Sequence, residues 1–294
     1  MRSIRKITAG SAAFAAAAVL AFTMFASARL QAAEAGPEAP PAAAATPSSD
    51  NPATRTAPKA PAFACAAPAE LARFTYPLRH TARRLADGRP LTIVAIGSSS
   101  TAGAGASSRA ASYPSQLAIE LKQRFPSGDI TVLNRGVNGE ETEQMMARFD
   151  SGVLAEHPDL VLWQVGTNSV LHDAPLQRHS ILLHEGVARL TAAGADVVLI
   201  DLQFTPRVLA KAETQGMEDQ IAMTAKEATV NLFNRFAVMR NWYEVQHIPY
   251  ERFLAPDSLH MNDWSYACVA KLLAGAIAEA VSRPSASAAM RATH

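Results

Sequence analysis

Short runs of apolar, β-branched residues alternate with longer segments of helical spacing, and this alternation is the most restrictive feature of the chain. The runs predicted to be strands cover residues 92–96, 130–133, 160–165, 196–202 and 230–233. The segments predicted to be helices cover residues 112–125, 141–156, 176–193, 217–228, 235–245 and 262–282. Strands that are apolar along their whole length are typical of a parallel sheet covered by helices on both faces. We therefore expect an α/β fold, a three-layer α/β/α sandwich with a five-stranded parallel sheet.

The N-terminal part of the chain has the pattern of a targeting segment. Arg2, Arg5 and Lys6 precede an uncharged, Ala-rich stretch over residues 7–28, and small residues follow it. This order is typical of a secretory signal peptide, which we place at residues 1–33. An uncleaved N-terminal membrane anchor is the alternative, because the stretch is long enough to span a bilayer. Both interpretations place the rest of the protein outside the cytoplasm, in the periplasm or secreted. No other segment is expected to span a membrane.

The regions on either side of the predicted sandwich have a composition unsuited to folding. Residues 34–62 are dominated by Ala and Pro and cannot bury enough apolar surface to offset the entropy of ordering. We interpret them as a disordered linker and residues 284–294 as a flexible tail. Residues 63–283 remain as one domain, which is large enough to hold a full hydrophobic core.

The charge balance limits the class of partner. The chain of 294 residues carries 27 Lys and Arg against 26 Asp and Glu, a formal net charge of +1. A nucleic-acid-binding surface would need a basic stripe, so no nucleic-acid partner is expected. A small-molecule or glycan ligand fits this balance better.

The chain has two cysteines, Cys65 and Cys268. An oxidising compartment would permit a disulfide between them, which would tie the start of the domain to its last helix. The alternative is two unpaired thiols, with Cys268 buried as a small apolar residue. Their spacing offers no metal site.

Polar blocks follow three of the predicted strands, and a fourth precedes the last helix. The blocks are Gly97-Ser98-Ser99-Ser100, Asn134-Arg135-Gly136-Val137-Asn138-Gly139, Gly166-Thr167-Asn168 and Asp257-Ser258-Leu259-His260. Functional residues in parallel α/β sheets gather at the carboxyl ends of strands. In sequence and order these blocks resemble those of the SGNH, or GDSL, family of serine esterases and lipases. The resemblance covers about residues 90–280 and implies a flavodoxin-like sandwich.

The resemblance assigns a role to one residue or two in each block. Ser99 matches the nucleophile, and Asp257 and His260 match the Asp-x-x-His pair. Gly139 and Asn168 match the residues that form the oxyanion hole together with the backbone N–H of Ser99. No metal or organic cofactor is implied.

These residue types fit the chemistry of acyl transfer. A serine hydroxyl becomes a good nucleophile only when a base removes its proton, and an imidazole does this readily near neutral pH. A carboxylate on the other ring nitrogen fixes the tautomer and stabilises the imidazolium. Backbone and side-chain N–H donors stabilise the oxyanion of the tetrahedral intermediate.

The chain departs from the family at Ser98, where the family usually has Asp. We expect the missing carboxylate to weaken the anchoring of the nucleophile loop, and it leaves the substrate open.

The sequence predicts an exported serine esterase that acts through an acyl-Ser99 intermediate. The expected substrate carries a short acyl group, such as an O-acetyl group on a carbohydrate or a small lipid ester. One alternative is an O-acyltransferase to a sugar hydroxyl, and another is a non-catalytic glycan-binding domain. Asp173, Phe204 and Arg207 follow the third and fourth strands and are candidate substrate contacts.

Overall fold

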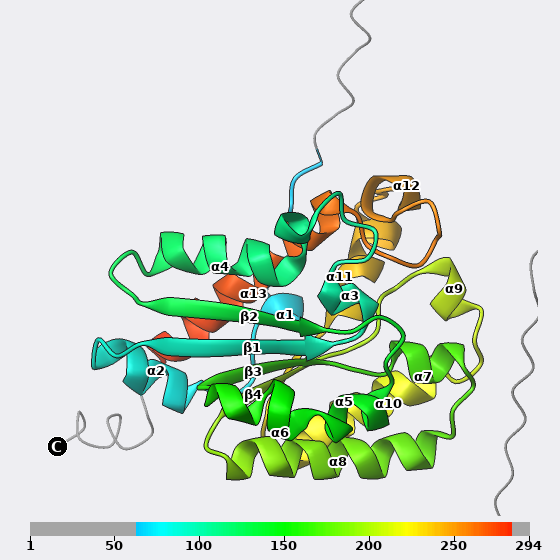
Figure 1. The fold of residues 1–294 in the computed structure, drawn as a ribbon. Coiled ribbons are helices and arrows are strands. Elements are labelled where there is room, and N and C mark those ends of the chain that lie inside the picture. The colour runs from blue at the N-terminus through cyan, green and yellow to red at the C-terminus, as the bar shows by residue number, and fades with distance from the viewer. Residues whose placement is uncertain (1–62, 284–294) are drawn as a thin grey trace, which may run out of the picture. The chain divides into compact units, whose positions relative to one another are not determined.

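A computed structural model describes residues 63–283, and these form a sandwich around one parallel sheet (Figure 1). The strands are β1 (Leu91–Gly97), β2 (Ile130–Gly136), β3 (Leu160–Gln164), β4 (Asp196–Ile200) and β5 (Asn231–Phe233). They pair in the order β2-β1-β3-β4-β5, all in parallel, which is the flavodoxin-like strand order. The predicted fold class and the five parallel strands are thus confirmed.

Helices cover both faces of the sheet. The longer ones are α2 (Arg79–Ala86), α4 (Tyr113–Arg124), α8 (Leu176–Ala192), α10 (Thr214–Glu227) and α13 (Asp263–Ser282). The shorter ones are α1 (Ala69–Ala72), α3 (Ser99–Ala102), α5 (Thr142–Ala147), α6 (Phe149–Gly152), α7 (Thr167–Leu171), α9 (Pro206–Leu209), α11 (Arg235–Arg240) and α12 (Tyr250–Phe253). Helices α4 and α13 lie on one face, and α5, α6, α8 and α10 lie on the other (Figure 1). Helices α3, α7 and α9 lie at the carboxyl edge of the sheet.

The core lies between the sheet and its two helical layers. Every residue of β3 is buried, as are residues 93–97 of β1, because these strands are central and covered on both faces. Trp163 on β3 packs edge-on against Phe149, with ring centroids 5.0 Å apart. This rigid centre fixes the positions at which the strands end, and therefore the loops that follow them.

The segment at 141–156 is not the single helix that its spacing predicts. Helix α5 ends before Arg148, α6 follows it, and a 3-10 turn (Leu154–Glu156) completes the segment. The Arg148 guanidinium donates hydrogen bonds to Glu140 and to the Arg135 carbonyl, contacts that replace a regular helical continuation. The predicted helix at 235–245 likewise changes after α11 into a π-helical turn (Asn241–Val245).

Helix α13 is long and apolar enough, by length and composition alone, to cross a membrane. An 18-residue stretch of it has a mean hydropathy of 1.3. The helix packs against α4, and ten of its residues are buried in the domain. Its apolar surface therefore belongs to the core.

A disulfide joins Cys65 to Cys268 on α13, with their Cα atoms 5.3 Å apart. It attaches the segment before α1 to the last helix of the domain. The predicted signal peptide (1–33), linker (34–62) and tail (284–294) lie outside the described residues.

Candidate active site

The four sequence blocks meet at the carboxyl edge of the sheet. Ser99 begins α3 directly after β1, Gly139 follows β2, and Asn168 lies on α7 after β3. Asp257 and His260 lie in the loop between α12 and α13. The parallel sheet thus brings together residues that lie far apart in the sequence.

Ser99 is held by contacts around its own turn. The backbone N–H and the hydroxyl of Ser98 both donate to Gln164 Oε1 at the end of β3, at 2.9 and 3.0 Å. Asn134 at the end of β2 donates to the Thr101 carbonyl at 2.9 Å. Gly136 permits this approach, because a Cβ there would lie 2.1 Å from the Ala102 nitrogen. The expectation that Ser98 leaves the loop weakly anchored is therefore wrong.

Ser99, His260 and Asp257 form a continuous chain of hydrogen bonds. His260 Nε2 lies 2.8 Å from Ser99 Oγ, and His260 Nδ1 lies 2.5 Å from Asp257 Oδ2. Because a carboxylate can only accept, Nδ1 carries the proton and Nε2 is free to accept from the serine hydroxyl. This is the arrangement that a base-activated serine requires.

The Asp257 carboxylate is fixed by the turn that contains it. Its Oδ1 atom accepts from the backbone N–H groups of Leu259 and His260 at 3.0 and 2.9 Å. Partial burial raises the pKa of Asp257, but the hydrogen bonds from His260 and Leu259 outweigh burial and hold that pKa below its ordinary value. The carboxylate thus stays ionised beside the imidazole at neutral pH.

The three residues predicted to form the oxyanion hole also lie at this site. Ser99 is the first residue of α3, so its N–H has no partner within the helix. Gly139 has a φ of 80°, a conformation that glycine adopts without strain and that shapes the turn after β2. The Asn168 amide nitrogen donates one hydrogen bond to the Glu140 carbonyl at 2.8 Å and carries a second N–H, and Asn168 lines the pocket over Ser99.

A pocket of about 640 Å³ opens over these residues. Ser99, His260, Gly139 and Asn168 line it, and its other walls come from Ala104, Asn138, Leu171, His172, Arg207, Ala210, Lys211 and Leu259. Arg207 therefore lies where a substrate contact was expected. Asp173 instead pairs with Lys211 at 2.7 Å, and Phe204 is buried against Phe236.

A buried ionic group behind the nucleophile was not anticipated from the sequence. Arg235 is fully buried and donates to the Asp201 and Leu202 carbonyls and to Ser100 Oγ, the last at 2.9 Å. The Asp201 carboxylate accepts from the Phe236 N–H at 3.0 Å, and Glu218 accepts from the Leu202 N–H at 3.2 Å. No clear sequence signal marks this group, since Asp201 lies inside the predicted strand 196–202 and Arg235 begins the predicted helix 235–245.

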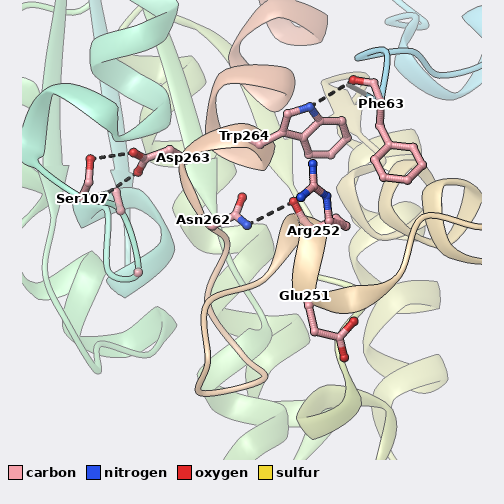
Figure 2. Close-up of a pocket in the computed structure, with 9 residues that line it drawn as sticks. Phe63, Ser107, Glu251, Arg252, Asn262, Asp263 and Trp264 are labelled. Atoms are coloured by element: carbon pink, nitrogen blue, oxygen red, sulfur yellow. Dashed lines mark hydrogen bonds between the residues drawn. The ribbon is translucent and has the colours of Figure 1, made fainter. Parts of the chain in front are cut away.

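A second pocket, of about 480 Å³, lies beside the loop after α3 (Figure 2). Gly105, Ala106 and Ser107 form one wall, whereas the preceding residue, Ala104, lines the catalytic pocket. Figure 2 shows the Trp264 and Phe63 side chains next to each other on the opposite side, with the Arg252 guanidinium beside them. Asp263 accepts hydrogen bonds from the backbone and hydroxyl of Ser107 and holds the separating loop in place.

Within residues 63–283, no group of three or more His, Cys, Asp or Glu side chains is placed to hold a metal ion.

The comparisons with known proteins identify the family. The non-GDSL lipase-like family matches residues 64–283. The chain belongs to this family. The family's name, non-GDSL, fits the serine at position 98, where the Gly-Asp-Ser pattern has Asp. The match to a lipase-like family confirms the resemblance found in the sequence blocks.

Three other proteins resemble the chain at 30% sequence identity or less. An arylesterase from Vibrio mimicus is 30% identical over 95 residues, which cover 32% of this chain and 46% of the relative. A two-domain esterase active on acetylated mannans superposes with a TM-score of 0.63 at 20% identity, over 74% of this chain and 57% of the other. An acetylxylan esterase from Geobacillus stearothermophilus gives 0.54 at 17% identity, over 66% and 95%. These similarities show a shared fold.

Proposed function

We propose that this protein is a serine esterase that hydrolyses a short-chain ester through an acyl-Ser99 intermediate. The observation that carries the proposal is the unbroken chain from Ser99 Oγ through His260 to Asp257, with both heavy-atom distances at 2.8 Å or less. The three N–H donors beside it supply the second requirement of acyl transfer.

The geometry supports the following sequence of steps. His260 Nε2 takes the proton of Ser99 as Oγ attacks the ester carbonyl, and the Ser99, Gly139 and Asn168 N–H groups bind the resulting oxyanion. The intermediate collapses, and His260 returns the proton to the leaving alcohol. Water then attacks the acyl group with His260 as base, which releases the acid and restores Ser99.

We propose a glycan as the alcohol part of the substrate, with acetyl as the acyl group. The catalytic pocket is open and carries polar side chains such as Asn138 and Arg207, which suit a hydroxylated alcohol. The second pocket begins only one loop away, because Ala104 and Ser107 are separated by at most about 11 Å of chain. Its aromatic rings and charged groups would suit neighbouring sugar units. The solved neighbours that act on acetylated mannans and acetylxylan agree with this choice.

We also propose that the enzyme works outside the cytoplasm. The signal-like pattern of residues 1–33 supports an exported protein. The Cys65–Cys268 disulfide supports it independently, because disulfides persist in oxidising compartments.

The test is hydrolysis of p-nitrophenyl esters of increasing acyl length by the purified protein. We expect turnover that is fastest for acetate and that falls about 10⁴-fold or more in Ser99→Ala and His260→Ala. Ser108→Ala is the matched control, since Ser108 is an exposed serine of the same loop. A folded wild-type protein without turnover would refute the proposal and favour a glycan-binding role. Transfer of acetyl to an added sugar in preference to water would identify an O-acyltransferase.

A further inference from the structure

The lining of the catalytic pocket has an uneven charge that the reaction described above does not use. Among its twelve lining residues, Arg207 and Lys211 are permanent cations, and none is Asp or Glu. A cleft lined by charges of one sign attracts ligands of the opposite sign. The pocket therefore favours a substrate that carries negative charge.

Two acidic side chains that contact lining residues are already paired. Asp173 pairs with Lys211 Nζ at 2.7 Å, and Glu141 contacts His172 Nδ1 at 2.8 Å. The Asp173 pair offsets the charge of Lys211. Neither carboxylate offsets the charge of Arg207.

Arg207 is the lining cation without an acidic partner. The residue is exposed, and its side chain forms no ion pair or hydrogen bond within residues 63–283. A guanidinium presents its donors as a planar fork that matches the two oxygens of a carboxylate. Arg207 is therefore free to bind an anionic group that enters the pocket.

The backbone that carries Arg207 is held in place from the core. Val208 beside it is fully buried, its N–H donates to Thr205 Oγ1 at 3.4 Å, and its carbonyl accepts from the Thr214 hydroxyl at 2.6 Å. Helix α9 also packs against α7, the helix that carries Asn168. A binding residue on a fixed element loses less freedom when a ligand arrives.

Charge and size indicate which anion the pocket suits. One unpaired guanidinium matches a single carboxylate, whereas a phosphate monoester carries a charge of about −1.5 to −2 at neutral pH. The volume of about 640 Å³ lies in the range of pockets that bind small ligands. The proposed acetyl group is uncharged, so the carboxylate has to lie on the alcohol part. In a glycan, a sugar that carries a carboxylate is a uronic acid.

We infer that Arg207 is a specificity-determining residue that binds the carboxylate of a uronic acid, so that the substrate is an acetylated acidic glycan. The presence of the acetyl ester rests on the proposed esterase function, whereas the affinity for the carboxylate does not.

Two substrates that differ only at the sugar carboxyl group test the inference, namely acetylated glucuronate and acetylated glucuronamide. We expect the wild type to prefer the glucuronate ester by about 10-fold in kcat/KM, the lower end for a hydrogen bond to a charged group. Arg207→Gln abolishes this preference and Arg207→Lys keeps part of it. Salt at about 0.5 M weakens it in the wild type.

Arg89→Gln is the matched control. Arg89 is also an exposed arginine, but it precedes β1 at the amino edge of the sheet, so this variant keeps the wild-type preference.

A binding measurement removes the dependence on turnover. Calorimetry with Ser99→Ala should show glucuronate binding about 10-fold more tightly than glucuronamide, and Ser99→Ala combined with Arg207→Gln should show no difference.

Three results would overturn the inference. They are equal binding of the two sugars, a preference that persists in Arg207→Gln, and tighter binding of glucose 6-phosphate than of glucuronate. Turnover of p-nitrophenyl acetate without any preference for glucuronate refutes this inference alone. Preferential binding of glucuronate without turnover of any ester refutes the esterase proposal alone, so the two failures are distinguishable.

Discussion

The side chain that most constrains the chemistry of this site is His260. Its Nδ1–H is directed at Asp257, which leaves Nε2 facing the Ser99 hydroxyl. Asp257 is in turn held by two backbone N–H groups of the same turn. The orientation of His260 is thus set by contacts within residues 257–260. Ser99 is the member of the hydrogen-bonded chain that comes from another part of the fold.

Asn168 is the proposed side-chain donor to the oxyanion, and its removal isolates that contribution. We expect Asn168→Ala to lower kcat for p-nitrophenyl acetate by about 100–1,000-fold, because one preorganised donor is lost. The Ser99–His260 pair is untouched, so labelling of the protein by a fluorophosphonate should persist, although more slowly. Steady-state kinetics measure kcat of the variant, and a melting curve shows whether it is folded. Unchanged kcat in a folded variant would remove Asn168 from the oxyanion hole.

Glu218 gives the molecule a predicted dependence of stability on pH. Burial, together with the charge of Asp201 beside it, raises the pKa of Glu218 far above its ordinary value of 4.5. The folded state therefore holds a proton that the unfolded state releases, so stability falls as pH rises above about 4.5 toward the raised pKa.

Glu218→Gln removes that titration while it keeps a donor toward Asp201. We expect the variant to match the wild type near pH 4.5 and to have a Tm several degrees higher near pH 9. Melting curves across this range test the prediction. A Tm difference that stays constant with pH would contradict it.

At the scale of elements, the nucleophile helix α3 is held from three sides. Gln164 fixes its start from β3, Asn134 fixes its end from β2, and Arg235 reaches Ser100 from α11. The backbone of Ser99 is thus held by neighbours that do not line the catalytic pocket.

Ser100→Ala removes the contact to Arg235 alone. We expect kcat to fall about 10–150-fold, the equivalent of the 1.5–3 kcal/mol that a hydrogen bond to a charged group contributes, while KM stays near its wild-type value. The rate of fluorophosphonate labelling should fall in parallel, because the nucleophile itself is displaced. If Tm falls while both rates stay at wild-type values, the contact serves stability only.

The elements that could be predicted were those whose signal is local. The strands were visible because central strands are apolar throughout, and the blocks that follow them were visible because their residues are polar and ordered along the chain. The role of Gln164 in holding the Ser98 turn was not recognised, because Gln164 lies inside the segment 160–165, whose apolar composition predicts a buried strand. The residues Arg235 and Ser100 are 135 positions apart in the sequence, so no local sequence pattern predicts their contact. The break at Arg148 likewise depends on tertiary contacts with Glu140 and Arg135.

At the scale of the whole molecule, the described domain is closed by a link between its two ends. The Cys65–Cys268 disulfide spans 203 positions and attaches the first described segment to α13. Trp242 Nε1 and Gln246 Nε2 both donate to the Ala66 carbonyl at 3.0 Å, so this segment is also held by hydrogen bonds.

The paired variant Cys65→Ser with Cys268→Ser should lose about 2–5 kcal/mol of stability, because the unfolded chain is no longer constrained. Neither cysteine lines the catalytic pocket, so activity at 25 °C should remain close to that of the wild type. Denaturant unfolding measures the loss, and a reductant should lower wild-type stability but leave the variant unchanged. Equal stability of the two proteins would show that the link contributes nothing.

The central claim is that Ser99 is the nucleophile, and the most direct test is to locate a covalent adduct. The wild-type protein is treated with a fluorophosphonate, digested and sequenced by mass spectrometry, which distinguishes Ser98, Ser99 and Ser100. The account predicts one adduct, on Ser99, and none in His260→Ala under the same conditions. An adduct on another serine, or no adduct on the folded wild-type protein, would contradict it.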